Sequence, residues 1–117
     1  MTQPSARLSI RIDLPDGRFG PGKAALLRAI AETGSISAAA RALKMSYARA
    51  WSLTEEMNTS FGSPLLETFT GGNRRGGTQL SEAGERVLEI YDRISERASR
   101  SAARDLEAIT AIDLKAR

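Results

Sequence analysis

The sequence predicts a mostly α-helical fold that includes one small β-hairpin, and three observations support this prediction. Several segments carry apolar residues at the three- and four-residue spacing of a helix face. Two short extended segments flank a glycine-rich stretch, as they do in a hairpin. The chain has 117 residues, of which 41% are hydrophobic, and this is enough for the single core of one domain.

The composition argues against an enzyme. The chain contains no cysteine and no histidine, which removes disulfides, thiolate and imidazole metal ligands, and nucleophile–base pairs built on those side chains. None of the three lysines, Lys23, Lys44 and Lys115, completes a Ser-x-x-Lys arrangement. We therefore expect no catalytic residue, no metal site and no cofactor.

Positive charge is concentrated in the first half of the chain. The net charge is +3, but residues 1–50 carry eight basic and three acidic side chains, while residues 51–117 carry nine basic and eleven acidic ones. All but three of the basic residues are arginine, which suits bidentate contacts with phosphate and guanine. This asymmetry favours a nucleic-acid partner for the first half. Scatter over a solvated surface is the alternative.

The chain lacks the patterns of membrane insertion and export. Charges interrupt every apolar run before it reaches the roughly 20 residues that a membrane span needs. Met1–Ala6 has no charged-then-apolar signal pattern. We therefore expect no membrane association and a cytoplasmic location.

The first elements are a strand and a helix. Apolar and polar residues alternate through Arg7–Leu14, which predicts one half-buried strand, and Pro15–Gly17 is a turn signal. The next helix is predicted to begin near Pro21 and to end at Gly34. Its expected apolar stripe consists of Leu26, Leu27, Ile30 and Ala31.

A helix-turn-helix is predicted at Ser37–Asn58. Ser37–Leu43 is a short alanine-rich helix, with Ser35 and Ser37 as candidate N-caps, and its small side chains permit close packing on a neighbour. A two-residue connection, Lys44-Met45, leads to a third helix capped by Ser46 and stopped by Gly62-Ser63-Pro64. Such a pair of helices typically places the N-terminal end of the second in the major groove. An ordinary helical hairpin is the alternative.

The third helix is predicted to have an apolar side and a polar side. The apolar side comprises Tyr47, Ala50, Trp51, Thr54, Met57, Asn58 and Phe61. Arg49 is the first candidate for a base contact, to guanine, while Tyr47 belongs more naturally to the core because it lies on the apolar stripe. The residues expected to contact DNA from this motif are Ser37, Lys44, Ser46, Tyr47, Ala48, Arg49 and Ser52.

A β-hairpin follows the third helix. Pro64–Thr70 and Thr78–Leu80 are the predicted strands, and Gly71–Gly77 is a flexible tip. Arg74 and Arg75 at that tip are expected to meet DNA phosphates or a minor groove, as in a wing. A solvated surface loop is the alternative. A nucleotide-binding P-loop is rejected, because the position that requires lysine holds Gly77.

A long helix capped by Ser81 ends the chain. Its apolar stripe includes Val87, Tyr91, Ile94 and Ala98, whose spacing suits a seam between two helices, so we expect a homodimer. Packing of this stripe on its own domain is the alternative. We predict one winged helix-turn-helix domain at residues 1–95 and a frayed continuation of the last helix at residues 96–117.

Two long segments resemble a known family. Gly34–Asn58 and Pro64–Ile94 are similar to the N-terminal DNA-binding domain of ModE-type molybdate-responsive bacterial regulators, whose fold is LysR-like. The resemblance rests on G-S-I-S-x-A-A-x-x-L, M-S-Y-x-x-A-W, E-M-N, the T-G-G-x-x-x-G-G wing and L-S-x-x-G. It implies a winged helix-turn-helix and a dimer on a partly palindromic operator. The family's molybdate-binding module has no counterpart in residues 1–117, so we expect no molybdate binding by this chain.

The sequence therefore predicts a sequence-specific regulator that binds double-stranded DNA. A protein-interaction module that keeps the fold without DNA specificity is the alternative, because Glu55 and Glu56 lie beside the predicted recognition surface and acids repel phosphate.

Overall fold

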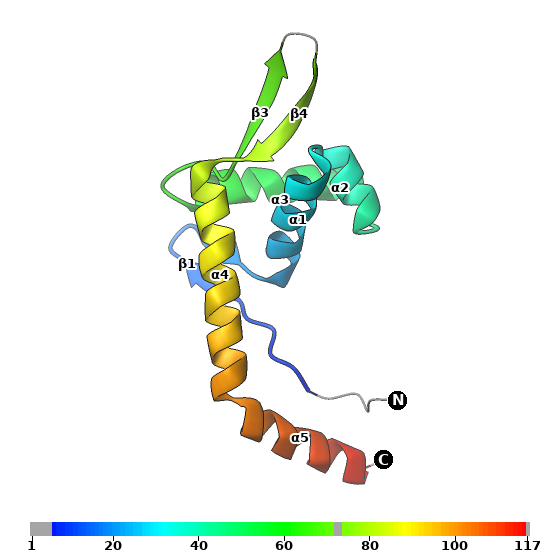
Figure 1. Cartoon of the computed structure of the whole chain (residues 1–117), viewed down its shortest axis with the longest axis vertical. Coiled ribbons are helices and arrows are strands. Elements are labelled where there is room, and N and C mark those ends of the chain that lie inside the picture. The colour runs from blue at the N-terminus through cyan, green and yellow to red at the C-terminus, as the bar shows by residue number, and fades with distance from the viewer. Residues whose placement is uncertain (1–5, 72–73, 117) are drawn as a thin grey trace.

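The computed structural model describes residues 6–71 and 74–116. Within that part, helices account for most of the chain and the strands form two antiparallel hairpins (Figure 1). The elements are, in order, β1 (Ile12–Leu14), β2 (Gly17–Phe19), α1 (Pro21–Thr33), α2 (Ile36–Ala42), α3 (Tyr47–Ser60), β3 (Leu66–Gly71), β4 (Arg74–Leu80), α4 (Glu82–Ser101) and α5 (Ala103–Ala116). The winged helix-turn-helix fold with a long helix behind it is confirmed.

Serine side chains cap the N-termini of three helices. The hydroxyl oxygens of Ser35, Ser46 and Ser81 each accept a hydrogen bond from the backbone N–H three residues later, at 2.9 to 3.1 Å. These bonds satisfy backbone donors that a helix leaves unpaired at its start. Of the two predicted caps of α2, the structure uses Ser35.

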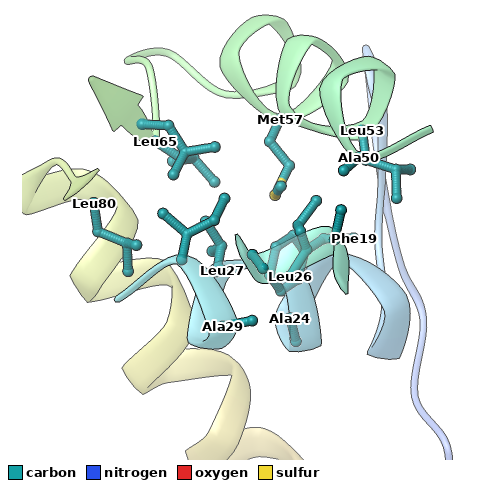
Figure 2. Close-up of a cluster of buried hydrophobic side chains, with 14 of the residues drawn as sticks. Phe19, Ala24, Leu26, Leu27, Ala29, Ala50, Leu53, Met57, Leu65 and Leu80 are labelled. Carbon is teal, nitrogen blue, oxygen red and sulfur yellow. The ribbon is translucent and has the colours of Figure 1, made fainter. Parts of the chain in front are cut away.

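The core lies between α1 and α3 and is closed by the wing and α4. Leu26, Leu27 and Ile30 of α1 and Met57 of α3 are fully buried, and Leu26 and Leu27 face Met57 (Figure 2). Leu65, just before β3, completes the centre of this cluster. Burial of large side chains of this kind stabilises by about 1.5–3 kcal/mol each, so the α1–α3 contact fixes the orientation of α3.

The segment before α1 differs from the prediction. Instead of one strand over Arg7–Leu14, only Ile12–Leu14 is a strand, and it pairs with Gly17–Phe19, with Ile12 opposite Phe19. The predicted turn at Pro15–Gly17 is the reason, because it folds the chain back tightly enough for pairing. The ring of Phe19 then lies edge-on to that of Tyr91 in α4, at 5.1 Å between centroids.

The predicted last helix is divided in two. α4 ends at Ser101, the chain bends at Ala102, and α5 leaves at an angle (Figure 1). Ser99–Asp105 offers no large apolar side chain to hold a straight helix on the domain, and the Ala6 N–H donates to the hydroxyl of Thr110 in α5 at 2.9 Å. The predicted boundary at residue 95 falls inside α4 and stays a prediction. In the described part of the chain, no helix combines the length and apolar character needed to cross a membrane.

The base of the wing docks on the turn between α1 and α2. The Thr78 N–H donates to the Gly34 carbonyl oxygen at 2.9 Å. A Cβ on Gly77 would lie 2.6 Å from that same oxygen, so only glycine permits this approach. Asn58 supports the other strand, because its side-chain oxygen accepts from the N–H groups of Leu65 and Leu66 at 3.0 Å each.

We predict that Gly77→Ala lowers the free energy of unfolding by about 1–3 kcal/mol, because the added methyl group must displace backbone. Urea denaturation measures the change. Gly62→Ala is the matched control, since a Cβ at Gly62 meets nothing within 4 Å. Equal stability of the two variants would contradict the close approach.

Candidate nucleic-acid interface

α2 and α3 are joined by a tight turn that a left-handed residue makes possible. The Met45 N–H donates to the Ala40 oxygen at 3.0 Å and the Lys44 N–H to the Arg41 oxygen at 3.1 Å, the two bonds of a Schellman motif. Lys44 occupies the position that usually holds glycine, with φ at 56°. The turn therefore stores backbone strain at the predicted interface.

Small side chains set the distance between the helices. Ala39 of α2 and Ala50 of α3 are fully buried, and Ala40 is 3% exposed. Alanine at these positions allows α2 to lie close against its neighbours, which confirms the predicted role of the alanine-rich segment. The first turn of α3 is thereby held at the surface, beyond the end of α2.

The N-terminal turn of α3 is fully presented to solvent. Ser46, Tyr47, Ala48 and Arg49 are all exposed, and Ser52 one turn further is exposed too. The Ser46 hydroxyl accepts the cap bond from the Arg49 N–H, so its own proton stays available for donation. Within residues 6–71 and 74–116, the side chain of Arg49 forms no hydrogen bond or ion pair. These side chains are free to meet a ligand.

The core assignment of Tyr47 and Trp51 is wrong. Their side chains are 53% and 48% exposed, respectively. The buried stripe of α3 is Ala50, Leu53, Thr54 and Met57. The prediction omits Leu53, which is 8% exposed and faces the core near Phe19 (Figure 2). The stripe is rotated because the first hairpin, which the sequence prediction lacks, covers the side of α3 that carries Leu53.

Two further predicted contact residues lie near this surface. Ser37 is exposed in the first turn of α2, and Lys44 is exposed in the turn before α3. Glu56, which motivated the alternative of a protein-interaction module, forms an ion pair with Lys23 at 3.1 Å. The charge of Glu56 is therefore offset within the domain. Glu55 is exposed.

The wing strands are longer than predicted. β3 and β4 pair from Leu66–Leu80 at the base to Gly71–Arg74 near the tip, whereas the sequence places residues 71–77 in a loop. The backbones of Arg74 and Arg75 belong to β4. The side chains of both arginines, which carry the predicted phosphate contacts, lie outside the described part of the structure.

The predicted dimer seam is only partly open to a partner. Tyr91 is 7% exposed, and its hydroxyl donates to the Ile10 oxygen at 2.6 Å, so it belongs to the core of its own protomer. Val87 and Ala98 are half-buried, and Ile94 is 40% exposed. For Tyr91 the alternative, packing on its own domain, is the one that the structure supports.

Lys23 is a structural residue that the sequence did not single out. It is 6% exposed, and its Nζ donates to the Arg18 oxygen at 2.7 Å besides pairing with Glu56. It thereby ties α1 to β2 and to α3. A lysine in the first turn of a helix is usually exposed, so the sequence gives no indication that Lys23 is buried. In the described residues, no cluster of three or more acidic side chains is placed to hold a metal ion.

Comparison with known proteins gives a family and several relatives. The family model described as bacterial regulatory helix-turn-helix protein, lysR family, matches residues 23–85. The transcriptional regulator ModE of Haemophilus influenzae is 46% identical over 72 residues, 62% of this chain and 28% of that protein. The molybdenum-pterin-binding protein MopB of Rhodobacter capsulatus is 43% identical over 77 residues, 66% of this chain and 28% of that protein. The chain thus spans under a third of the length of these relatives.

Solved structures agree with this relation. The crystal structure of the CbnR_DBD–DNA complex has a TM-score of 0.57 and 32% identity, and covers 75% of this chain and 95% of that one. Full-length CbnR, a LysR family transcriptional regulator, has a TM-score of 0.54 at 32% identity, over 72% of this chain and 27% of that one. The predicted resemblance to ModE-type and LysR-like regulators is confirmed.

We predict that Lys44→Gly raises the free energy of unfolding by about 0.5–1 kcal/mol. Release of left-handed strain of about 1–2 kcal/mol exceeds the entropy that glycine adds to the unfolded chain. Lys44→Ala is the control, because it removes the same charge and keeps the strain. Urea denaturation compares the two variants, and a Lys44→Gly protein no more stable than Lys44→Ala would contradict the prediction.

Proposed function

The chain belongs to the bacterial regulatory helix-turn-helix proteins of the lysR family, and from this premise we propose that it is a sequence-specific DNA-binding transcriptional regulator of the ModE type. The observation that carries the proposal is the solvent-exposed N-terminal turn of α3, Ser46–Arg49. A domain stabilised only by its own packing has no need to expose a tyrosine and an unpaired arginine within one helical turn. The major groove reads such side chains at the start of a recognition helix. DNA as the partner implies a cytoplasmic location.

Each exposed residue of the motif has a role that its chemistry suggests. Arg49 reads guanine through its O6 and N7 atoms, and Tyr47 and Ser46 contact neighbouring base edges or phosphates. Ala48 approaches a thymine methyl group, and Ser52 lies one turn further along the groove. Ser37 and Lys44 contact the phosphate backbone and so fix the register of α3 on the duplex.

The wing contributes to DNA affinity and not to sequence specificity. Arg74 and Arg75 are the first residues of β4, and the hairpin of β3 and β4 extends from the domain beside α3 (Figure 1). We propose that they contact backbone phosphates or the minor groove next to the site that α3 reads. The bond between Thr78 and Gly34 holds the wing at a fixed position relative to the helix-turn-helix.

The functional unit is a homodimer on a partly palindromic operator. Ile90 and Ile94 are 36% and 40% exposed on α4, beside the half-buried Val87 and Ala98. An apolar face of this kind on a long helix is stabilised by a second copy of the same helix. Two recognition helices then meet half-sites about one helical turn apart.

Selection from a randomised pool of duplex DNA, at moderate salt and with purified protein, tests the function. Enrichment of an inverted repeat protected in footprinting is expected. A pool that shows no sequence preference would refute the proposal and leave the protein-interaction module as the better account.

We predict that Arg49→Ala weakens binding to the selected site by roughly 10- to 100-fold and relaxes base preference at one position of each half-site. Competition binding with single-base variants of the site measures both effects. Arg104→Ala on the exposed face of α5 is the charge-matched control. An equal loss of affinity for all variants of the site would mean that Arg49 contacts the DNA backbone and not a base.

The double variant Arg74→Ala and Arg75→Ala is predicted to weaken binding to all sequences by a similar factor. Loss of two phosphate contacts lowers the slope of log affinity against log salt by about 1.8. Fluorescence anisotropy with labelled DNA at several salt concentrations measures the slope. An unchanged slope would place both arginines away from the DNA.

A further inference from the structure

A basic pocket lies between the first hairpin, the start of α1 and the N-terminal half of α3. Its volume is about 440 Å³, and its wall includes Arg11 of the segment before β1, Arg18 of β2 and Arg49 of α3. These arginines are separated by up to 38 positions in the sequence, and only the folding of the hairpin against α3 brings them to one pocket. We call this the arginine pocket.

The arginine pocket has an excess of positive charge that its own acids do not balance. Lys23 and Glu56 at the pocket wall pair with each other at 3.1 Å. Arg11 pairs with Asp13 at 3.1 Å, but both side chains are more than half exposed, and such pairs contribute little. In residues 6–71 and 74–116, the guanidinium groups of Arg18 and Arg49 have no ion pair or hydrogen-bond partner. The wall of this open pocket therefore includes two arginines whose guanidinium groups are unpaired within the described residues.

The start of α1 adds backbone N–H donors to the pocket, and these also favour an anion. Gly20, Pro21 and Gly22 line the pocket, and no side chain caps this 13-residue helix. The backbone N–H of Gly22 has no helical acceptor, and a Cβ at Gly22 would meet nothing within 4 Å. The start of α1 therefore brings an unpaired N–H to the wall of the pocket, with open space beside Gly22.

We propose that the arginine pocket binds a tetrahedral oxyanion of the phosphate type. Guanidinium groups match such oxygens bidentately, and no acidic side chain of the pocket is left unpaired to repel them. Because Arg49 also lies in the exposed turn of α3, the pocket adjoins the surface that reads the bases, and the oxyanion in the regulator's working state is a DNA backbone phosphate that Arg18 and the start of α1 hold while Arg49 contacts the neighbouring guanine. This last step rests on the proposed function, whereas binding of a free oxyanion does not.

The hairpin of β1 and β2 then has a function in addition to covering the core. It carries Arg18 to the same surface as the recognition helix, and so it forms a second clamp on the duplex, on the opposite side of α3 from the wing. A phosphate held there fixes the angle of α3 in the groove without reading any base.

Two pairs of variants test the pocket. Gly22→Asp places a carboxylate in the open space of the pocket, at a helix start where aspartate is favourable for folding, and Gly22→Asn is its neutral isostere. Arg18→Gln removes one free guanidinium group, and Arg104→Gln on α5 is its charge-matched control. Urea denaturation of all four proteins establishes that they fold.

Two measurements distinguish the source of the oxyanion. In the first, each protein binds the selected operator and an unrelated duplex over a range of salt. Gly22→Asp and Arg18→Gln are expected to lose affinity for both duplexes several-fold, and Arg18→Gln is expected to lower the slope of log affinity against log salt by about 0.9 relative to Arg104→Gln.

In the second measurement, inorganic phosphate is titrated at constant ionic strength while the backbone amide resonances of residues 22 and 23 are followed. A saturable shift that Gly22→Asp abolishes and Gly22→Asn retains identifies a free oxyanion as a ligand.

The oxyanion site is supported if Gly22→Asp or Arg18→Gln, but not its control, loses DNA affinity or loses the phosphate-dependent amide shift. If both variants bind DNA with the slope of their controls and phosphate causes no saturable shift, the inference is overturned, while the proposed function stands on the selection experiment. If the wild-type protein selects no DNA site, the proposed function fails, and the phosphate titration still decides the pocket.

Discussion

The close approach of α2 and α3 through buried alanines is the contact on which the functional surface depends. Ala39 and Ala50 are fully buried, and a larger side chain at either position would push the two helices apart. This distance allows the chain to turn within the four residues Leu43–Ser46, but only with Lys44 in a left-handed conformation. The same packing leaves the first turn of α3 beyond the core. Strain in the turn and exposure of the first turn of α3 thus have one cause.

A second close approach couples the wing to this surface. Gly77 and Thr78 of β4 lie against the carbonyl oxygen of Gly34, the residue that ends α1 in a left-handed conformation with φ at 78°. The turn that starts the helix-turn-helix therefore also anchors the wing. α4, capped by Ser81 directly after β4, continues from the same anchor. α3, the wing and α4 are consequently positioned by one small group of backbone contacts.

The site combines local and distant contributions. The residues at the start of α3 are contiguous, so the sequence alone brings them together. The arginine pocket is different, because Arg18 and Arg49 meet only through the hairpin of β1 and β2. The buried Lys23, held by the Arg18 carbonyl and by Glu56, fixes the hairpin, α1 and α3 to one another below that pocket.

The sequence by itself determined the features that depend on neighbours along the chain. Proline, glycine and serine set where α1, α3 and α4 begin and where α1 ends, and the alanine-rich segment specified a short, closely packed α2. The side of α3 that is buried was decided by tertiary structure, because the hairpin covers Leu53 and leaves Tyr47 and Trp51 exposed. The assignment of Tyr91 to its own core and the bend at Ala102 have the same origin. Periodicity shows that a helix has an apolar side, but the direction of that side to within one residue is set by which distant segment packs against it.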